Sequence, residues 1–269
     1  MLYLVATPIG NLGDFSSRAR EILEQVDLVA CEDTRTSRSL FSLLGLRVKS
    51  TIAYHDFNEE KATQNLIKKL KEGVDIALVS DAGMPLISDP GYRLVKACHE
   101  QNIPVTSIPG ANAVLTALQL SGLPTDRFYF GGFFPPKSGA RQNVLKGIEN
   151  LSATLIFYET ARRLKEALSD IQKVLGNRSM TVVRELTKKF EEVKCGTPDE
   201  LNSYYIEAPK GEIVLVISGA EEKKREIPRI TISDLRKNLS SKDSAFVWAL
   251  LTGKSKKEAY AEVLANDKL

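Results

Sequence analysis

The sequence lacks the features of a membrane-bound or secreted protein. No segment approaches the ~18 consecutive apolar residues that a membrane-spanning helix requires, and the start, MLYLVATPIGN, has no basic region or long apolar stretch typical of a signal peptide. The three cysteines, Cys31, Cys98 and Cys195, are far apart and form no CxxC pair. We therefore expect free thiols, no membrane association and a location in the reducing cytoplasm.

Motifs for common cofactors are also missing. The chain contains no GxGxxG, and Pro8 interrupts the one loop in which Gly10 and Gly13 invite a dinucleotide interpretation. It contains no GxxxxGK[ST] loop for nucleotide phosphates. The two histidines, His55 and His99, are distant and the cysteines are isolated, so the spacing predicts no metal site. These absences argue against a nicotinamide, nucleoside triphosphate or metal enzyme.

The composition is that of an ordinary globular protein, but its charge is unevenly distributed. The 269 residues are 43% hydrophobic and 26% charged, enough for one large or two medium domains. Residues 219–269 contain 11 Lys/Arg and 8 Asp/Glu, whereas the remainder has 26 of each. The net charge of +3 therefore lies in the C-terminal segment, which is either a nucleic-acid contact or a solvated surface.

Short apolar runs alternate with amphipathic segments in residues 1–121. This alternation predicts a doubly wound parallel sheet with helices on both faces. Ser16 and Asn58 are suitable N-caps for two of these helices. The expected strands are 2–6, 28–31, 51–54, 76–80 and 104–108, and the expected helices are 16–25, 37–44, 59–72, 92–101 and 111–120.

Hairpin elements after residue 121 predict a mixed sheet. The expected strands are 128–130, 154–158, 179–185, 191–195 and 212–217, and the expected helices are 142–150, 162–175 and 198–205. Three further helical segments follow near 233–239, 243–251 and 256–265, in which we expect Phe246, Val247, Trp248, Leu250 and Leu251 to pack on neighbouring helices. We therefore predict an α/β protein with domains 1–121 and 122–221 and a basic helical tail, 222–269.

An unusual loop follows each strand of the first predicted sheet. In a parallel sheet these loops meet at one edge, where ligands bind, so we expect a site there. The fourth loop is longer than the ~2–6 residues that join a strand to a helix and is expected to form one wall. The five loops are 7–14 (TPIGNLGD), 32–35 (EDTR), 54–59 (YHDFNE), 80–91 (SDAGMPLISDPG) and 109–113 (PGANA).

Nine motifs in order carry a resemblance to a known family: VATPIGNLGD, EDTR, HDFNE, SDAGMPLISDPG, PGANA, GFFPPK, FYE, RELTK and KGEIVLVI. Together they resemble the tetrapyrrole methylase family, and within it the ribosomal RNA branch. The resemblance implies a two-domain class III methyltransferase that binds S-adenosylmethionine between its domains and forms a homodimer. It also implies methylation of the ribose 2′-hydroxyl of a cytidine in the decoding region of 16S rRNA, in the small ribosomal subunit.

The same motifs carry over a set of cofactor-binding residues. Met84 stands where the family usually has threonine, and PGANA replaces the commoner PGPCA, so backbone groups are the expected contacts of these two loops. The residues implied are Pro8, Ser80, Asp81, Ala82, Gly83, Met84, Pro109, Gly110, Ala111, Asn112, Ala113, Tyr158, Arg184, Glu185, Leu186, Lys210, Gly211 and Glu212.

Methyl transfer to a ribose hydroxyl needs no metal, but the hydroxyl is a poor nucleophile and a general base contributes ~10²–10⁴-fold. The acidic or basic side chains available on the loops are Glu32, Asp33, His55, Glu59, Asp81 and Glu159. We favour the groups of EDTR and HDFNE, with Arg35 orienting a phosphate or a carboxylate. The alternative is that Glu32 and Arg35 pair with each other and hold the loop.

Four basic residues are candidates for RNA contact. Lys137 and Arg141 accompany the aromatics of GGFFPPKSGAR, a combination suited to stacking and phosphate binding, although this segment is equally a hinge with buried phenylalanines. Lys188 and Lys189 lie at a predicted hairpin tip. Two other functions stay open: methylation of a small tetrapyrrole by the same fold, and a non-catalytic RNA-binding module.

Overall fold

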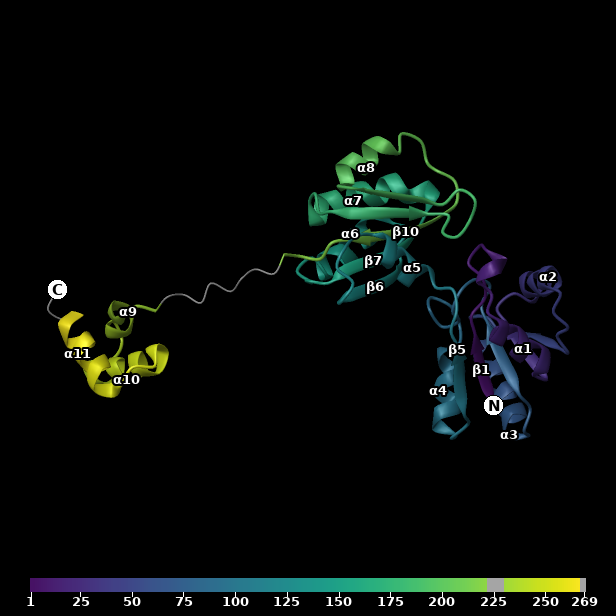
Figure 1. The fold of residues 1–269 in the computed structure, drawn as a ribbon, viewed down its shortest axis with the longest axis horizontal. Helices are drawn as coiled ribbons and strands as arrows, with labels where there is room; N and C mark the ends of the chain where they lie inside the picture. Colours follow the sequence, from purple (N-terminus) through teal and green to yellow (C-terminus); the bar gives the residue numbers. More distant parts are fainter. Residues whose placement is uncertain (222–229, 267–269) are drawn as a thin grey trace. The chain divides into compact units, whose positions relative to one another are not determined.

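The computed structural model describes residues 1–221 and 230–266. The chain divides into two units, Met1–Glu221 and Glu222–Leu269 (Figure 1). The first unit contains two five-stranded sheets, and the second contains three helices in its described part. Among the described residues, no helix combines the length and the apolarity needed to cross a membrane. All three cysteines are free thiols, as expected.

The first sheet is parallel throughout, in the order β3-β2-β4-β1-β5. Its central strand, β4, is buried along its whole length, because helices cover both faces of a sheet of this kind. The parallel sheet predicted from the alternating pattern is therefore confirmed. The strands are β1 (Leu2–Val5), β2 (Leu28–Cys31), β3 (Thr51–Ala53), β4 (Ile76–Val79) and β5 (Val105–Ile108).

Four helices cover the two faces of the first sheet. On one face, α1 (Ser17–Gln25) and α2 (Thr34–Leu44) pack over alternate residues of β4, including Ala77. On the other face, α3 (Glu59–Lys71) and α4 (Tyr92–Glu100) pack over the intervening residues, including Leu78. Successive side chains of a strand point to opposite faces of the sheet. A strand in which every residue is apolar therefore needs helices on both faces, which gives the doubly wound arrangement.

Among the helices that cover the first sheet, the starts of α2 and α3 differ from the sequence-based expectation. Ser16 caps α1 as predicted, with its hydroxyl oxygen accepting the Ala19 amide hydrogen at 3.1 Å. Asn58 precedes α3 but makes no side-chain cap; its Oδ1 accepts from the backbone amide of His55 at 2.9 Å. Asp33 caps α2, which therefore begins three residues earlier than the predicted 37.

The second sheet is mixed, as predicted, with the order β6-β7-β10-β8-β9. The pair β6–β7 is parallel, and the other pairs are antiparallel, including the expected β8–β9 ribbon. A register shift in β6 lies between Phe130 and Phe133. The strands are β6 (Phe128–Phe133), β7 (Thr154–Thr160), β8 (Met180–Arg184), β9 (Glu192–Gly196) and β10 (Glu212–Ile217).

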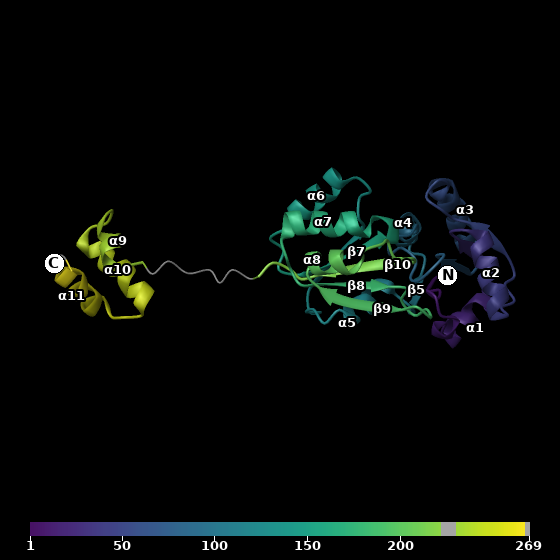
Figure 2. The same cartoon turned by 90° about the horizontal axis from the view of Figure 1, so that it is seen from above.

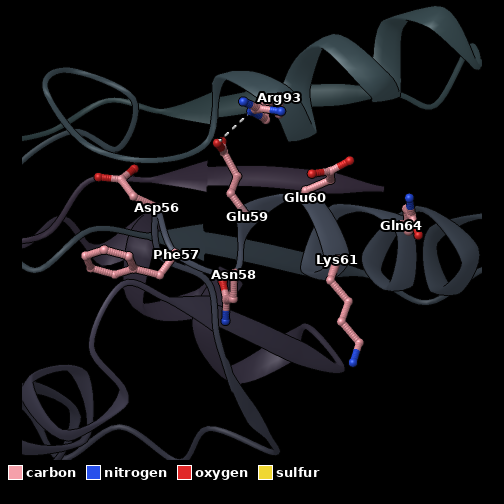
Figure 3. A pocket seen from close by; sticks show the side chains of 8 residues that line it. All are labelled: Asp56, Phe57, Asn58, Glu59, Glu60, Lys61, Gln64 and Arg93. Carbon is pink, nitrogen blue, oxygen red and sulfur yellow. Dashed lines mark ion pairs between the residues drawn. The ribbon is translucent and has the colours of Figure 1, made fainter.

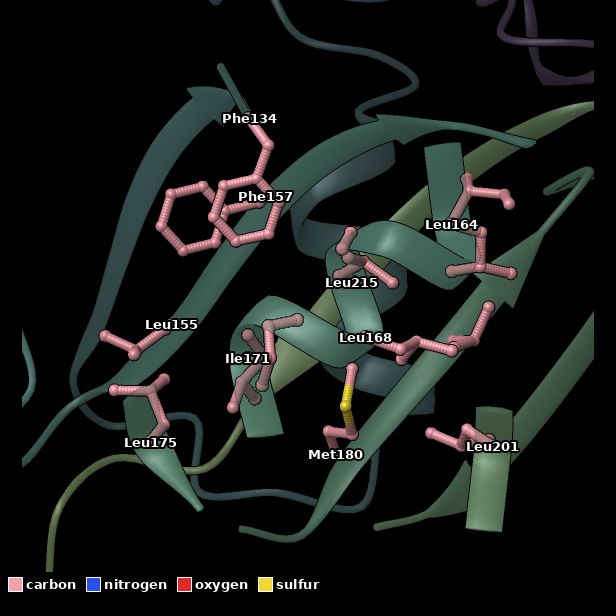
Figure 4. Packing of buried hydrophobic residues seen from close by; sticks show 14 of the residues in the cluster. Phe134, Leu155, Phe157, Leu164, Leu168, Ile171, Leu175, Met180, Leu201 and Leu215 are labelled. Atoms are coloured by element: carbon pink, nitrogen blue, oxygen red, sulfur yellow. The ribbon is translucent and has the colours of Figure 1, made fainter. Parts of the chain in front are cut away.

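Helices from different parts of the chain cover this second sheet (Figure 2). One face packs against α6 (Ser138–Gly147), α7 (Leu164–Leu175) and α8 (Pro198–Tyr204) around a core in which the rings of Phe134 and Phe157 stack at 3.9 Å (Figure 4). The other face packs against α5 (Ala113–Leu120), although α5 follows β5 directly in the chain. Helix α5 therefore packs with the second sheet, although the predicted domain boundary at residue 121 assigned it to the first domain.

The described part of the second unit is a small helical cluster. It comprises α9 (Ile232–Arg236), α10 (Ser241–Thr252) and α11 (Lys256–Asn266), with Ile232, Ala245 and Val263 in its core. The expectation that Phe246, Leu250 and Leu251 pack on neighbours is wrong, because their exposed fractions are 50%, 70% and 53%. Trp248 is packed against the core. The basic residues 223–225 lie outside the described part of the chain.

Candidate active site

A cavity of about 520 Å³ lies between the loop edge of the first sheet and the strands of the second sheet. Its volume is within the ~300–1,000 Å³ range of small-molecule sites. The predicted cofactor residues that line it are Asp81, Ala82, Gly83, Met84, Asn112, Ala113, Tyr158, Leu186, Gly211 and Glu212. The remaining predicted residues do not line it: Pro8, Ser80, Pro109, Gly110, Ala111, Arg184, Glu185 and Lys210.

Hydrogen bonds from the loop after β1 hold the loop after β4 in place. Backbone groups of Thr7 and Gly83 exchange two hydrogen bonds, of 2.8 and 3.1 Å. The buried hydroxyl of Ser80 donates to the Gly83 carbonyl at 3.2 Å. Gly83 has φ +85, which disfavours any side chain there. Ser80 and Thr7 therefore support the cavity wall rather than contact its contents.

Met84 and Asn112, the two positions where the motifs depart from the family pattern, contact each other. The Asn112 amide lies 3.5 Å from the Met84 sulfur, and its Oδ1 caps α5 by accepting the Leu115 amide hydrogen at 3.0 Å. Both residues line the cavity. The Asn112 amide therefore gives the Met84 sulfur a polar partner, so the two departures from the family pattern occur at residues that contact each other.

Carboxylates from two neighbouring strands meet at this edge. Glu32 accepts the Asp81 amide hydrogen at 3.3 Å, and Asp81 accepts the Asp33 amide hydrogen at 3.1 Å. Glu32, Asp81 and Asp89 all line the cavity. Burial raises the pKa of each of the three, and raises that of Asp89 to about 7. No sequence pattern singled out Asp89, because its neighbours Pro90 and Gly91 indicated a turn.

Asp33 and Arg35 form a local pair on the surface. The guanidinium Nη2 lies 2.8 Å from Asp33 Oδ2, and the Arg35 side chain is 89% exposed. Hydrogen bonds from Arg35 lower the pKa of Asp33 to about 2. Neither residue lines the cavity. The alternative prediction was an ion pair within the EDTR loop, and such a pair exists, but Arg35 pairs with Asp33 rather than with Glu32.

The HDFNE loop lies beside a separate, open polar pocket (Figure 3). Glu59 accepts hydrogen bonds from the Tyr54 hydroxyl and the Gly91 amide, each at 3.2 Å, and pairs with Arg93 at 3.1 Å. These contacts tie the start of α3 to the start of α4. Neither His55 nor Glu59 lines the main cavity, so the structure does not bring the favoured catalytic groups together; of these, only Glu32 reaches it.

Lys188 pairs with two carboxylates, one of which, Glu212, lines the cavity, instead of extending into solvent. Its ammonium lies 3.0 Å from Glu185 and 2.8 Å from Glu212. A Cβ on Gly10 would lie 2.5 Å from Lys188 Cγ, so the loop after β8 rests on the loop after β1. The prediction that Lys188 contacts phosphate is therefore not supported, whereas Lys137 and Lys189 are exposed.

The prediction that Arg141 binds RNA is wrong, because its side chain is 0% exposed. Helix α6 begins at Ser138 rather than at the predicted 142, which places Arg141 inside the fold. Its Nε lies 2.6 Å from Asp170, and its two terminal nitrogens lie 3.6 Å from Glu159 and Glu166. Glu159 lines the cavity, but it is 2% exposed and also pairs with Arg163 at 2.7 Å, which makes it a poor candidate base.

Comparison with known proteins identifies the family. Residues 1–202 match the model of the Tetrapyrrole (Corrin/Porphyrin) Methylases. A ribosomal RNA small subunit methyltransferase I of Mesorhizobium japonicum is 47% identical, over 98% of this chain and 91% of that protein. The chain belongs to the tetrapyrrole methylase family, in the branch of ribosomal RNA small subunit methyltransferase I.

Further relatives and solved structures agree with this tetrapyrrole methylase assignment. The protein of the same name from Escherichia coli O157:H7 is 44% identical over 98% of this chain and 94% of its own length. Diphthine synthase superposes with a TM-score of 0.63 at 17% identity, covering 81% of this chain and 89% of that one. Uroporphyrin-III-C-methyltransferase from Thermus thermophilus gives 0.56 at 18%, covering 80% and 93%. These two structures support the class III fold.

The cavity suits the S-adenosylmethionine that tetrapyrrole methylases generally use. From the first sheet come the carboxylates of Glu32, Asp81 and Asp89, which complement cationic ammonium and sulfonium groups. From the second sheet come Val183, Leu186, Ile213 and Val214, which offer an apolar surface for an adenine ring. When bound, the cofactor supplies an electrophilic methyl group. Within residues 1–221 and 230–266, no group of three or more His, Cys, Asp and Glu is arranged to hold a metal ion.

Proposed function

We propose that the protein is an S-adenosylmethionine-dependent methyltransferase that modifies the ribose 2′-hydroxyl of a cytidine in the decoding region of 16S rRNA. The observation that carries the proposal is the cavity, in which half-buried carboxylates face an apolar wall. Relatives 43–49% identical that are named ribosomal RNA small subunit methyltransferase I support the RNA substrate. The partner is then the small ribosomal subunit.

The test is methyl transfer from labelled cofactor to small ribosomal subunits, with a precursor tetrapyrrole as the competing acceptor. We expect label in 16S rRNA, recovered after alkaline hydrolysis as an alkali-resistant dinucleotide that begins with cytidine, because a 2′-O-methyl group blocks cleavage at that ribose. Label in the macrocycle would favour the small-molecule alternative. Cofactor binding with no transfer to either acceptor would contradict the proposed activity.

The proposal includes a cytoplasmic homodimer. Three free cysteines support a reducing compartment, and the motif resemblance is the basis for the dimer. Light scattering of the purified protein is expected to give twice the 29.7 kDa chain mass. A monomer mass at micromolar concentration would contradict the dimer without affecting the proposed chemistry.

The C-terminal unit is proposed to add RNA affinity through exposed lysines on and before α11. Lys254, Lys256 and Lys257 are exposed, and the Lys256 ammonium lies 5.4 Å from the centre of the Phe246 ring. Deleting residues 222–269 is expected to weaken binding to the small subunit and to flatten its salt dependence. The slope should fall by about 0.9 for each duplex phosphate that the deleted segment neutralises in the parent.

Two double variants test whether lysines of the C-terminal unit, rather than lysines elsewhere on the protein, cause the salt dependence of binding. We expect Lys256→Ala with Lys257→Ala to flatten the salt dependence of binding, and Lys68→Ala with Lys71→Ala on the exposed side of α3 to leave it unchanged. Filter binding at several salt concentrations measures both. If the truncated protein kept full affinity and slope, the tail would have no part in RNA binding.

A further inference from the structure

The two phenylalanines of the GGFFPPK motif have opposite environments. Phe134 is 1% exposed and stacks on Phe157 in the core of the second sheet (Figure 4). Phe133 is 59% exposed and lines the cavity. Phe133 is therefore the aromatic side chain of this motif that remains available to a ligand.

A bulge in β6 places Phe133 on the cavity side of the sheet. Phe130 pairs with Ile156 and Phe133 pairs with Tyr158, so the step between the two pairs is three residues in β6 but two in β7. In an unbroken strand, Phe130 and Phe133 would point to opposite faces, because side chains alternate. The extra residue of a bulge re-aims the side chains that follow it. Phe133 therefore shares a face with Tyr158.

Two glycines make this bulge possible. A Cβ on Gly131 would lie 2.1 Å from the ring of Phe157, and Gly132 has φ +69, a conformation that disfavours any side chain. A Cβ on Gly132 would also lie 3.6 Å from the hydroxyl oxygen of Ser88, which lines the cavity. The bulge therefore lies beside the loop after β4, and it brings Phe133 and Ser88 to the same end of the cavity.

Phe133 begins a row of cavity-lining side chains that crosses four neighbouring strands. It pairs with Tyr158 of β7, Tyr158 pairs with Val214 of β10, and Val214 pairs with Val183 of β8. All four residues line the cavity. Paired residues lie on the same face of a sheet, and neighbouring strands are ~4.8 Å apart, so the row extends over ~14 Å.

The two ends of this row differ in chemistry and in access to solvent. Val183 and Val214 are buried, Tyr158 is half-buried and Phe133 is exposed. The aliphatic end is therefore the closed end of the cavity, and it suits the adenine ring of the cofactor. The aromatic end is the open one. Its ring centres, of Phe133 and Tyr158, are 5.1 Å apart with a tilt of 59°, so the two rings do not stack on each other.

An RNA acceptor can enter this cavity only as an unstacked nucleotide. A duplex is much wider than a cavity of about 520 Å³, so a ribose that reaches the methyl donor must leave the helix with its base. The extruded base loses its stacking neighbours. Proteins that bind unstacked RNA bases replace those neighbours with aromatic side chains. The aromatic end of the row offers such a replacement.

We propose that Phe133 is the stacking platform for the base of the target nucleotide after that base has left the RNA stack. This inference rests on the proposed function, because it requires an RNA acceptor. The base lies against Phe133, and the cofactor adenine lies against Val214 and Val183, two to three strand spacings or ~10–14 Å away. This separation leaves room for the ribose and the methyl donor between them. The exposed, cavity-lining hydroxyls of Ser88 and Thr160 can donate to or accept from the edge of the base.

The experiment compares variants of Phe133 with variants of Phe128, which lies on the same strand and is also exposed but does not line the cavity. Phe133→Leu keeps an apolar side chain and removes the ring. We expect it to lower kcat/KM for small ribosomal subunits at least ~5-fold, since loss of a stacking ring costs ~5–150-fold. Phe133→Tyr keeps the ring, and both it and Phe128→Leu should stay within about threefold of the parent. Calorimetry should show cofactor affinity within about threefold of the parent in every variant.

An added tryptophan reports on stacking without any turnover. The parent contains one tryptophan, Trp248, in the C-terminal unit. The probe is single-stranded oligocytidylate, added with S-adenosylhomocysteine at a concentration that saturates the protein in a filter assay. In Phe133→Trp, the fluorescence should fall more than in the parent, because a stacked base quenches an indole. Phe128→Trp should respond as the parent does.

Several outcomes would overturn the assignment. A kcat/KM of Phe133→Leu within about threefold of the parent would do so, and so would equal losses in Phe133→Leu and Phe133→Tyr, because the ring would then not be the cause. An equal loss in Phe128→Leu would assign the effect to the edge strand rather than to the cavity. Quenching of Phe133→Trp by S-adenosylhomocysteine alone would place the cofactor adenine on this residue. If the parent transfers no methyl group to RNA, the proposed function fails, whereas the response to bound oligocytidylate still decides whether a base stacks at Phe133.

Discussion

Replacing Ala82 with tryptophan is expected to reduce cofactor affinity by ~100-fold or more, about 2.7 kcal/mol, while the protein stays folded. Ala82 lines the cavity, yet its own side chain is exposed, so a larger side chain meets the cavity space rather than the core. An indole presents ~150–250 Å² of surface, and the cavity holds about 520 Å³. The added ring therefore competes directly with any ligand of cofactor size.

Calorimetric titration with S-adenosylmethionine measures this effect, and the melting temperature reports on the fold. The matched control is Ala140→Trp, since Ala140 is also exposed but lies on α6, outside the cavity lining. The control should bind the cofactor as the parent does. Undiminished affinity in Ala82→Trp would show that the cofactor binds elsewhere, and would remove the main support for the candidate site.

Replacing Arg141 with alanine is expected to destabilise the first unit by ~3–5 kcal/mol, because it leaves buried carboxylates without their counter-charge. Arg141 and Glu159 both have side chains that are 0% exposed, and Asp170 is 8% exposed. The two terminal nitrogens of Arg141 are buried without a hydrogen-bond partner in the described residues, so charge is their main contribution. A loss of this size is a large share of the ~5–15 kcal/mol typical of a protein.

Urea unfolding followed by circular dichroism measures the loss, with Arg162→Ala as the exposed control, expected to change stability by less than ~0.5 kcal/mol. The deficit should shrink at lower pH. Burial alone would raise the pKa of Asp170, but hydrogen bonds from Gln142, Ser138 and Arg141 outweigh it and lower that pKa. The contacts of the Asp170 carboxylate therefore stabilise the parent at pH values above the pKa of an unfolded aspartate, and this stabilisation is lost as the pH falls. In the variant, the unpaired carboxylates become protonated over the same pH range, so the difference between the two proteins becomes smaller. Equal stability of the two variants would contradict the buried role of Arg141.

Local patterns sufficed for most of the elements. Strands such as β4 are unbroken apolar runs because both of their faces are buried, and the alternation with helices indicated their parallel pairing. The β8–β9 ribbon was recognisable because a short connection permits only antiparallel pairing. Ser16 was predictable as a cap because its partner, the Ala19 amide, is three residues away.

Long-range contacts account for what the sequence did not reveal. Arg141 lies near aromatic residues in the sequence and was predicted to contact RNA, but its side chain donates a hydrogen bond to Asp170, 29 residues away. Phe246 belongs to an apolar helical pattern, yet the small core around Val263 leaves it 50% exposed. Helix α5 follows the first sheet and packs on the second. In each case the partner lies too far along the chain for spacing to predict it.

The sequence by itself determined the family, the two kinds of sheet and the edge at which the site lies, because strand direction places every following loop at one rim. Only the tertiary structure decided which polar residues of that rim share a cavity. It made Glu59, Lys188 and Arg141 partners of neighbouring charges. It brought Asp89 into the cavity from a segment whose residues indicate a turn. Residue types are encoded locally, but their burial and orientation depend on packing between the two sheets.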